Sequence, residues 1–127
     1  MKELIIPKAQ SVLARNLLEV FNQRDEAKRL DLIQELYVTE ATFFELDGAF
    51  NGYEAINRRV TEVLQSLPPG AIFRTAGEMT ANHNVARLSW TLELEDGAVI
   101  ASGMDIGLLE GNRIAALYLF LDPAQTD

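Results

Sequence analysis

The chain has 127 residues, of which 48% are hydrophobic and 24% charged, with a formal net charge of −8 and a pI near 4.6. This size fits one globular domain over residues 1–127, and the acidity makes nucleic acids and anionic membranes poor partners, because phosphate binding requires clustered Lys and Arg. The lack of Cys and the single His exclude disulfides, thiol nucleophiles and any site with two His ligands from one chain.

The first third of the chain carries apolar residues at helical spacing. They predict a helix from Ala9 to Arg24, and the polar run from Asn22 to Glu26 breaks it. We expect the polar side of this helix to face solvent, with Arg15, Asn16, Glu19 and Gln23 on it. A second helix follows, with an apolar stripe formed by Leu30, Ile33, Leu36 and Tyr37.

A short strand and a third helix come next. The residues from Ala41 to Leu46 have the β-branched and aromatic character of a strand, and Asp47-Gly48 marks a turn after it. Asn51 is placed to cap the third helix, which Pro68-Pro69-Gly70 ends. The basic pairs of the helices are expected on solvated faces, namely Lys28-Arg29 and Arg58-Arg59.

From residue 71 onwards the apolar period changes from helical to two. Four strands are predicted, joined by tight turns that contain His83, Asp96-Gly97 and Gly111; they are Ala71–Thr80, Val85–Glu95, Ala98–Leu109 and Arg113–Leu121. Consecutive hairpins make an antiparallel sheet, and the three early helices must cover one face of it. The sequence therefore predicts an α+β fold.

Neither a signal peptide nor a membrane-spanning stretch is expected. The apolar run near the N-terminus is too short for a signal peptide, and no stretch reaches transmembrane length. A cytoplasmic location is the default expectation.

The last strand, "RIAALYLFL", is apolar on both faces. Alternation places Ile114, Ala116, Tyr118 and Phe120 on one side, and Ala115, Leu117, Leu119 and Leu121 on the other. Because the helices can bury only one side, a second copy of the chain is the expected cover for the outer face. The alternative is a cover formed by the N-terminal extension.

One carboxylate lies in the middle of an apolar strand, in the sequence "SGMDIGL". The neighbours of Asp105 on its own side are Gly103 and Gly107, which predicts a hollow on that face with an acid at its centre. A central-strand carboxylate is exposed, paired with a cation such as Arg74 or Arg87, or retained for chemistry.

Glu45 is a second candidate acid, at the end of "ATFFEL". Two carboxylates in an apolar site can divide acid and base roles, because desolvation keeps one protonated while the better-solvated one ionises. The alternative for Glu45 is an ordinary strand-end carboxylate in water. Phosphoryl transfer and metal-dependent hydrolysis have no support, since no phosphate loop or metal-ligand spacing occurs.

These residues together resemble the NTF2-like superfamily, in particular its SnoaL-like (polyketide cyclase-like) and ketosteroid-isomerase-like members, over roughly Val12 to Asp122. The resemblance is carried by "LLEVFNQRD", "ELYVTEATFFELDGAFNGYEAI", "SGMDIGLLEGNRI" and "LYLFLD". It implies a cone formed by a strongly curved sheet and three helices, an apolar pocket inside and a dimer outside.

The resemblance also implies site residues. Glu45 matches the position of the base in ketosteroid-isomerase-like proteins, and Asp105 matches both their protonated carboxyl and the acid/base of SnoaL-like cyclases. The isomerases carry a Tyr on the first helix that completes the oxyanion hole, and the matching residue here is Leu17. Tyr37 or Trp90 is a candidate substitute donor.

The function predicted from the sequence is binding of a small, apolar, oxygenated molecule inside the cone. The chemistry is cofactor-free proton transfer of cyclase or isomerase type, centred on Asp105 with Glu45 assisting, and without a metal. The expected pocket walls are Tyr37, Phe43, Tyr53, Trp90 and Leu117, although Trp90 and Tyr37 also fit a plain core role. The alternatives are a non-catalytic binding or dimerisation module and a hydrolase or dehydratase in which Asp105 activates water.

Overall fold

The structure is a computed structural model that describes residues 8–123. The predictions for the first seven residues, including the absence of a signal peptide and a possible cover for the sheet, lie outside the described residues. The helices are α1 (Lys8–Arg15), the π-helical turn η1 (Asn16–Val20), α2 (Glu26–Leu36) and α3 (Tyr53–Gln65). The strands are β1 (Tyr37–Glu45), β2 (Gly48–Asn51), β3 (Ile72–Thr75), β4 (Thr80–Asn82), β5 (Val85–Glu93), β6 (Val99–Glu110) and β7 (Arg113–Leu121).

The first two helices form close to where they were predicted. The first ends at Val20 instead of Arg24, in a π-helical turn. Asp25 caps α2, because its carboxylate accepts a hydrogen bond from the Lys28 N–H at 3.0 Å. Tyr37 does not belong to the helical stripe: its extended backbone ends α2 and begins β1.

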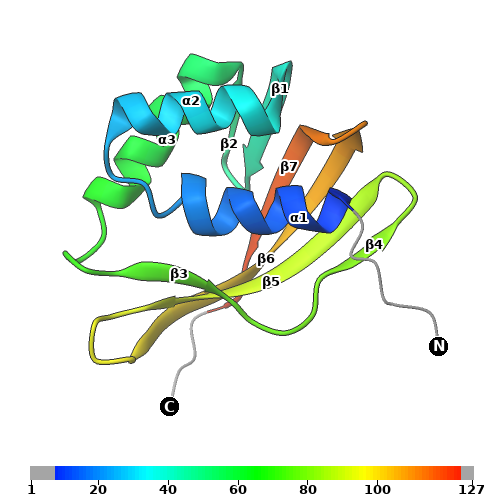
Figure 1. Cartoon of the computed structure of the whole chain (residues 1–127). Helices are drawn as coiled ribbons and strands as arrows, with labels where there is room; N and C mark the ends of the chain where they lie inside the picture. Colours follow the sequence, from blue (N-terminus) through cyan, green and yellow to red (C-terminus); the bar gives the residue numbers. More distant parts are fainter. Residues whose placement is uncertain (1–7, 124–127) are drawn as a thin grey trace.

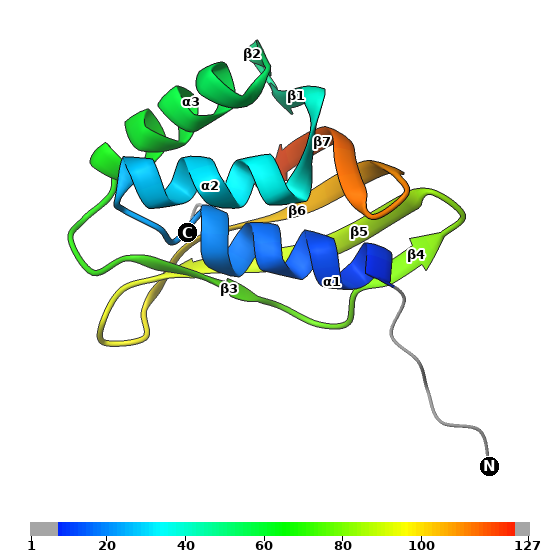
Figure 2. The same cartoon turned by 45° about the horizontal axis from the view of Figure 1, so that its top comes forward.

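A buried Arg joins α2 to α3. Arg29 was expected in solvent but is only 1% exposed, and its Nε donates to Asn57 Oδ1 at 2.6 Å. The same guanidinium donates to the Thr61 hydroxyl and to the Asn57 carbonyl oxygen. The prediction of a solvated face is therefore wrong at Arg29, and these hydrogen bonds join α2 to α3, which lies beside it (Figure 2).

The connection into α3 differs from its prediction. An extra strand, β2, pairs with β1, and Gly52 at φ 90° occupies the N-cap position that was predicted for Asn51. The Asn51 amide instead donates to the Glu40 carbonyl oxygen at 2.9 Å and to the Thr42 hydroxyl at 3.0 Å. Pairing with β1 therefore outweighs the capping preference of Asn51.

The described strands form one curved, open sheet in the order β2-β1-β7-β6-β5-β3, with β4 paired to β5. All pairs are antiparallel except β1 with β7, and the predicted strand from Ala71 to Thr80 is divided into β3 and β4. The helices lie on one face of the sheet, as predicted (Figures 1 and 2). None of the helices among residues 8–123 is long and apolar enough to cross a membrane.

The face of β6 towards the helices carries Asp105, between Gly103 and Gly107, and all three are buried. In β7 the predicted alternation is wrong at its start. The register shifts between Leu108 and Leu109, so Ile114 and Leu117 are both fully buried although they are three positions apart and strict alternation would place them on opposite faces.

The two glycines beside Asp105 leave no hollow, contrary to the prediction. A Cβ on Gly103 would lie 2.5 Å from Cζ2 of Trp90 and would also collide with the Phe120 carbonyl oxygen. A Cβ on Gly107 would lie 3.1 Å from Cδ1 of Leu13. The space left by the missing side chains is therefore filled, by the Trp90 indole at one glycine and by Leu13 at the other.

This packing predicts different costs at the two glycines. Gly103→Ala should lower the free energy of unfolding by about 3 kcal/mol, because the new methyl group overlaps both the Trp90 indole and the Phe120 backbone oxygen, and the backbone oxygen is held in place by the strand. Gly107→Ala is the matched control and should cost about 1 kcal/mol, since the tip of Leu13 can shift. Urea unfolding measures both; equal costs would contradict the account.

Candidate functional site

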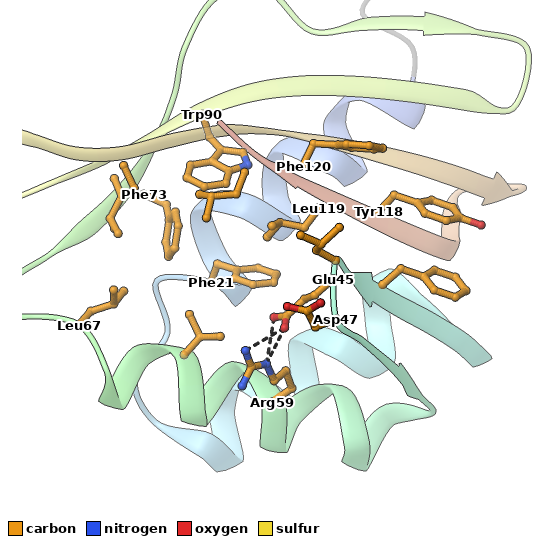
Figure 3. Close-up of a pocket in the computed structure, with 16 residues that line it drawn as sticks. Phe21, Glu45, Asp47, Arg59, Leu67, Phe73, Trp90, Tyr118, Leu119 and Phe120 are labelled. Carbon is orange, nitrogen blue, oxygen red and sulfur yellow. Dashed lines mark hydrogen bonds and ion pairs between the residues drawn. The ribbon is translucent and has the colours of Figure 1, made fainter. Parts of the chain in front are cut away.

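A pocket of about 830 Å³ lies between α3 and the inner face of the sheet (Figure 3). The lining residues come from the end of the first helix, α3 and the strands β3, β5, β6 and β7, and from the β1–β2 turn region. They are Phe21, Phe44, Glu45, Leu46, Asp47, Arg59, Val63, Leu67, Phe73, Trp90, Leu92, Ala101, Tyr118, Leu119, Phe120 and Leu121. Most of this surface is apolar, which suits an apolar ligand.

Three aromatic rings form the deep apolar end of the pocket. Phe73 packs edge-to-face against Phe21 and Trp90, with ring centroids 5.9 and 5.4 Å apart. Trp90 is only 3% exposed, and its ring occupies the space above Gly103. Edge-to-face pairs of this kind fix ring positions, so this end of the pocket is preformed.

Charged side chains gather at the α3 end (Figure 3). Arg59 Nε donates to both carboxylate oxygens of Glu45, at 3.0 and 2.9 Å, and Nη2 of Arg59 lies 2.8 Å from Glu45 Oε1. Nη1 donates to Glu62 at 3.0 Å, and the guanidinium lies over the Phe50 ring. The hydrogen bonds that Arg59 donates to Glu45 are the main cause that raises the pKa of Arg59. Asp47 also lines this end.

Asp105 is buried, and no cation of residues 8–123 forms an ion pair with it. It is 2% exposed, and its hydrogen bond comes from Trp90 Nε1, which donates to Oδ1 at 3.0 Å. Desolvation raises the pKa of Asp105 to about 7, although the Trp90 hydrogen bond acts in the opposite direction. Of the two cations proposed as partners, Arg74 pairs with Glu93 and Arg87 donates to Thr80. Asp105 can therefore gain or lose a proton near neutral pH.

Asp105 does not line the pocket but lies directly behind it. Its cross-strand partners are Leu88 and Leu119, and Gly103, two residues before it, pairs with Trp90. Leu119 and Trp90 both line the pocket. A ligand in the pocket is thus separated from the Asp105 carboxyl by these two side chains.

A second polar pair is buried behind the pocket, and the sequence did not indicate it. The Tyr37 hydroxyl donates to Asn16 Oδ1 at 2.6 Å, and the Asn16 Nδ2 has no hydrogen-bond partner among the described residues. Burial and the charge of Asp105 both raise the pKa of Tyr37 above its usual value. Asn16 was expected in solvent, and that expectation is wrong: Asn16 lies in the π-helical turn and is fully buried.

The residues expected as site residues are divided between the pocket and the core. Trp90 and Glu45 line the pocket. Three others are fully buried and do not line the pocket, namely Phe43, Tyr37 and Leu117. Phe43 and Leu117 are cross-strand partners. The Tyr53 hydroxyl donates to the Tyr37 carbonyl oxygen at 3.0 Å.

Arg59 and Asp47 were not predicted as pocket residues. Arg59 belongs to a basic pair that was assigned to a solvated face, and that assignment is wrong because Arg59 points at Glu45 (Figure 3). The spacing is only a partial signal. Arg59 comes three residues after the buried Ile56 and so borders the buried face of α3, but the packing of the helix decides that its side chain points at the pocket.

Known structures share the whole architecture of this chain. A proposed isomerase of the SnoaL-like family from Agrobacterium tumefaciens is 25% identical, with a TM-score of 0.83 over 92% of this chain and 100% of that chain. A proposed SnoaL-like polyketide cyclase from Jannaschia sp. is 12% identical, with a TM-score of 0.75 over 95% and 92% of the two chains. A proposed ketosteroid isomerase from Kribbella flavida is 14% identical, with a TM-score of 0.70 over 94% and 82%. No protein-family model and no curated protein sequence matches the chain.

The burial of Asp105 makes a prediction about stability. Its pKa is raised from 3.8 to about 7, so between these values the folded protein holds a proton that the unfolded chain releases. The Asp105 contribution to stability therefore falls as pH rises towards 7 and is constant above it. Asp105→Asn lacks the titrating carboxyl. From pH 5 to pH 8, the free energy of unfolding of the wild type should therefore fall by about 2 to 3 kcal/mol relative to that of Asp105→Asn, as measured by urea unfolding. An unchanged difference would mean that Asp105 titrates normally.

Proposed function

We propose that the pocket of this chain, whose fold is that of SnoaL-like and ketosteroid-isomerase-like structures, binds a small, largely apolar, oxygenated molecule. The volume of about 830 Å³ lies within the usual range for small-molecule sites, roughly 300–1,000 Å³. Aromatic and aliphatic side chains bury the body of the ligand, and the charged end at Glu45, Asp47 and Arg59 orients its polar group.

The chemistry that we assign to this pocket is cofactor-free proton transfer next to a carbonyl group. The Asp105 carboxylate takes a proton from the carbon beside the carbonyl, and the electrons of that C–H bond form the carbon–carbon double bond of an enolate. Where the ligand has a second double bond next to that carbon, the protonated Asp105 gives the proton to the far carbon of this double bond. The electrons on the enolate oxygen then re-form the carbonyl group, and the carbon–carbon double bond has moved into conjugation with it, which completes an isomerisation. Glu45, held by Arg59 at the other end of the pocket, assists by orienting the ligand.

One observation carries this assignment: a buried carboxyl without a cation, whose pKa is about 7, lies directly behind the pocket wall. A general acid–base group works best when its pKa is near the working pH. Direct contact requires the Trp90 side chain to leave its place above Gly103, which makes Trp90 a gate between ligand and acid.

The separation of Asp105 from the pocket favours a second candidate, a ligand-binding module without catalysis. Trp90 and Leu119 lie between the pocket and the carboxyl. If Trp90 stays in place when a ligand binds, Asp105 serves only to hold the indole. Binding and proton transfer must therefore be measured separately.

Proton transfer can be followed with 1-tetralone in D₂O, because exchange of the protons beside its carbonyl is visible by NMR. Wild type should catalyse this exchange, with a rate that rises as pH passes through about 7 and Asp105 ionises. Asp105→Asn should slow the exchange about 100-fold or more, while thermal stabilisation by 1-tetralone persists. Stabilisation without exchange in wild type would support the binding module and contradict the catalytic assignment.

We also propose that two copies pair through the outer face of the sheet. This face carries Met104 and Ile106 of β6 beside Tyr118 of β7, all partly buried, and the more exposed Ile100 and Phe120. Tyr118 and Phe120 also line the pocket, so the proposed interface borders it. Apolar residues that lie together in this way usually mark an interface.

The pairing predicts a change in mass. Met104→Glu places a charge at the centre of the outer face and should convert the dimer to a monomer, as measured by light scattering coupled to size-exclusion chromatography. Thr91→Glu, on the same outer face but on β5, is the control and should stay dimeric. A wild-type monomer at micromolar concentration would contradict the proposal.

A further inference from the structure

The charged end of the pocket has more negative than positive side chains. Glu45 and Asp47 line it, and Glu62 binds Arg59 from outside the lining, so three carboxylates surround one guanidinium. The Glu45 side chain is only 18% exposed, and the Arg59 side chain is 31% exposed. Because solvent reaches these groups only in part, their charges are screened less than charges on an open surface.

Each side-chain nitrogen that lines the pocket already has a carboxylate partner. Arg59 uses Nε and Nη2 for Glu45, and Nη1 for Glu62, while its guanidinium face lies over Phe50. The indole N–H of Trp90 is bound to Asp105. An anionic ligand would therefore find Arg59 neutralised, with carboxylates beside it.

Hydrogen-bond acceptors, by contrast, remain available to a ligand at this end of the pocket. Asp47 is exposed, lines the pocket and forms no ion pair with any described residue. The carboxylate oxygens of Glu45 face the same end of the pocket (Figure 3). A group that donates hydrogen bonds, above all one with a positive charge, is what these oxygens can bind.

We propose that the pocket selects molecules with an apolar body and a polar end that is an amine or a hydroxyl group, and that it rejects carboxylates and phosphates. This inference rests on the proposed binding function and adds the class of ligand. The apolar body lies against Phe73 and Trp90, and the donor group lies against Asp47 and Glu45. The excess of carboxylates sets the order of preference: amine, then alcohol, then acid.

Three probes that share one apolar body test the order: 2-(1-naphthyl)ethylamine, 2-(1-naphthyl)ethanol and 1-naphthylacetate. Isothermal titration calorimetry at pH 7.5 and low salt should show the amine binding about threefold to tenfold more tightly than the alcohol, and the acid at least tenfold more weakly than the alcohol. Added salt should narrow these differences, because the charges are partly screened.

Two variants locate the effect. Asp47→Asn should weaken amine binding and strengthen acid binding by about threefold each, with alcohol binding unchanged. Glu110→Gln removes the same charge from the exposed β6–β7 end, outside the pocket lining, and should leave all three affinities unchanged.

The outcomes separate this inference from the function on which it rests. If the alcohol binds and the acid binds as tightly or more tightly, the pocket stands and the charge preference is wrong. If both variants shift affinities equally, the effect comes from net charge and not from Asp47, which also overturns the inference. If none of the probes binds, the proposed binding function fails and the preference fails with it.

Discussion

The interaction on which the site depends is the hydrogen bond from the Trp90 indole to Asp105 across Gly103. Because Gly103 has no side chain, the Trp90 indole can lie against β6 at this position. Its N–H then meets the carboxyl of Asp105, two residues after the glycine. The bond compensates in part for burying a carboxyl without a cation. It also makes one residue, Trp90, both the wall of the pocket and the cover of the acid.

Two environments for carboxyl groups follow from this arrangement. Asp105 lies in a dry layer, where desolvation favours its neutral form. Glu45 lies at the opposite end of the pocket in an ion pair with Arg59. A ligand bound between them contacts an apolar wall at one end, with Asp105 buried behind it, and the negative charge of Glu45 at the other end. Binding selectivity and proton transfer are therefore assigned to different ends of one pocket.

The sequence predicted the elements whose patterns are local. The strand from Arg113 to Leu121 and the place of Asp105 on one strand face with Gly103 and Gly107 follow from alternation and from tight turns. Alternation did not decide whether this face lies under the helices or outside; the structure places it under the helices. The bulge that buries both Ile114 and Leu117 has no signature in the sequence of β7, since it depends on the register in which β6 and β7 pair.

Site residues fixed by helix packing were harder to predict. Asn16 and Arg59 are polar residues on amphipathic helices, and only the rotation of each helix on the sheet decides that they point inward. The filling of the space above Gly103 was likewise invisible, because Trp90 comes from a neighbouring strand. Pocket shape depends on sheet curvature, which periodicity does not encode.

The most direct measurement is an NMR titration of the side-chain carboxyl of Asp105 in the wild type and in Trp90→Phe. The account predicts a midpoint near pH 7 in the wild type. It also predicts a higher midpoint in Trp90→Phe, because the variant loses the hydrogen bond that favours the charged form. A midpoint near pH 4 in the wild type would show that Asp105 is solvated, and would contradict both the buried acid and the chemistry assigned to it.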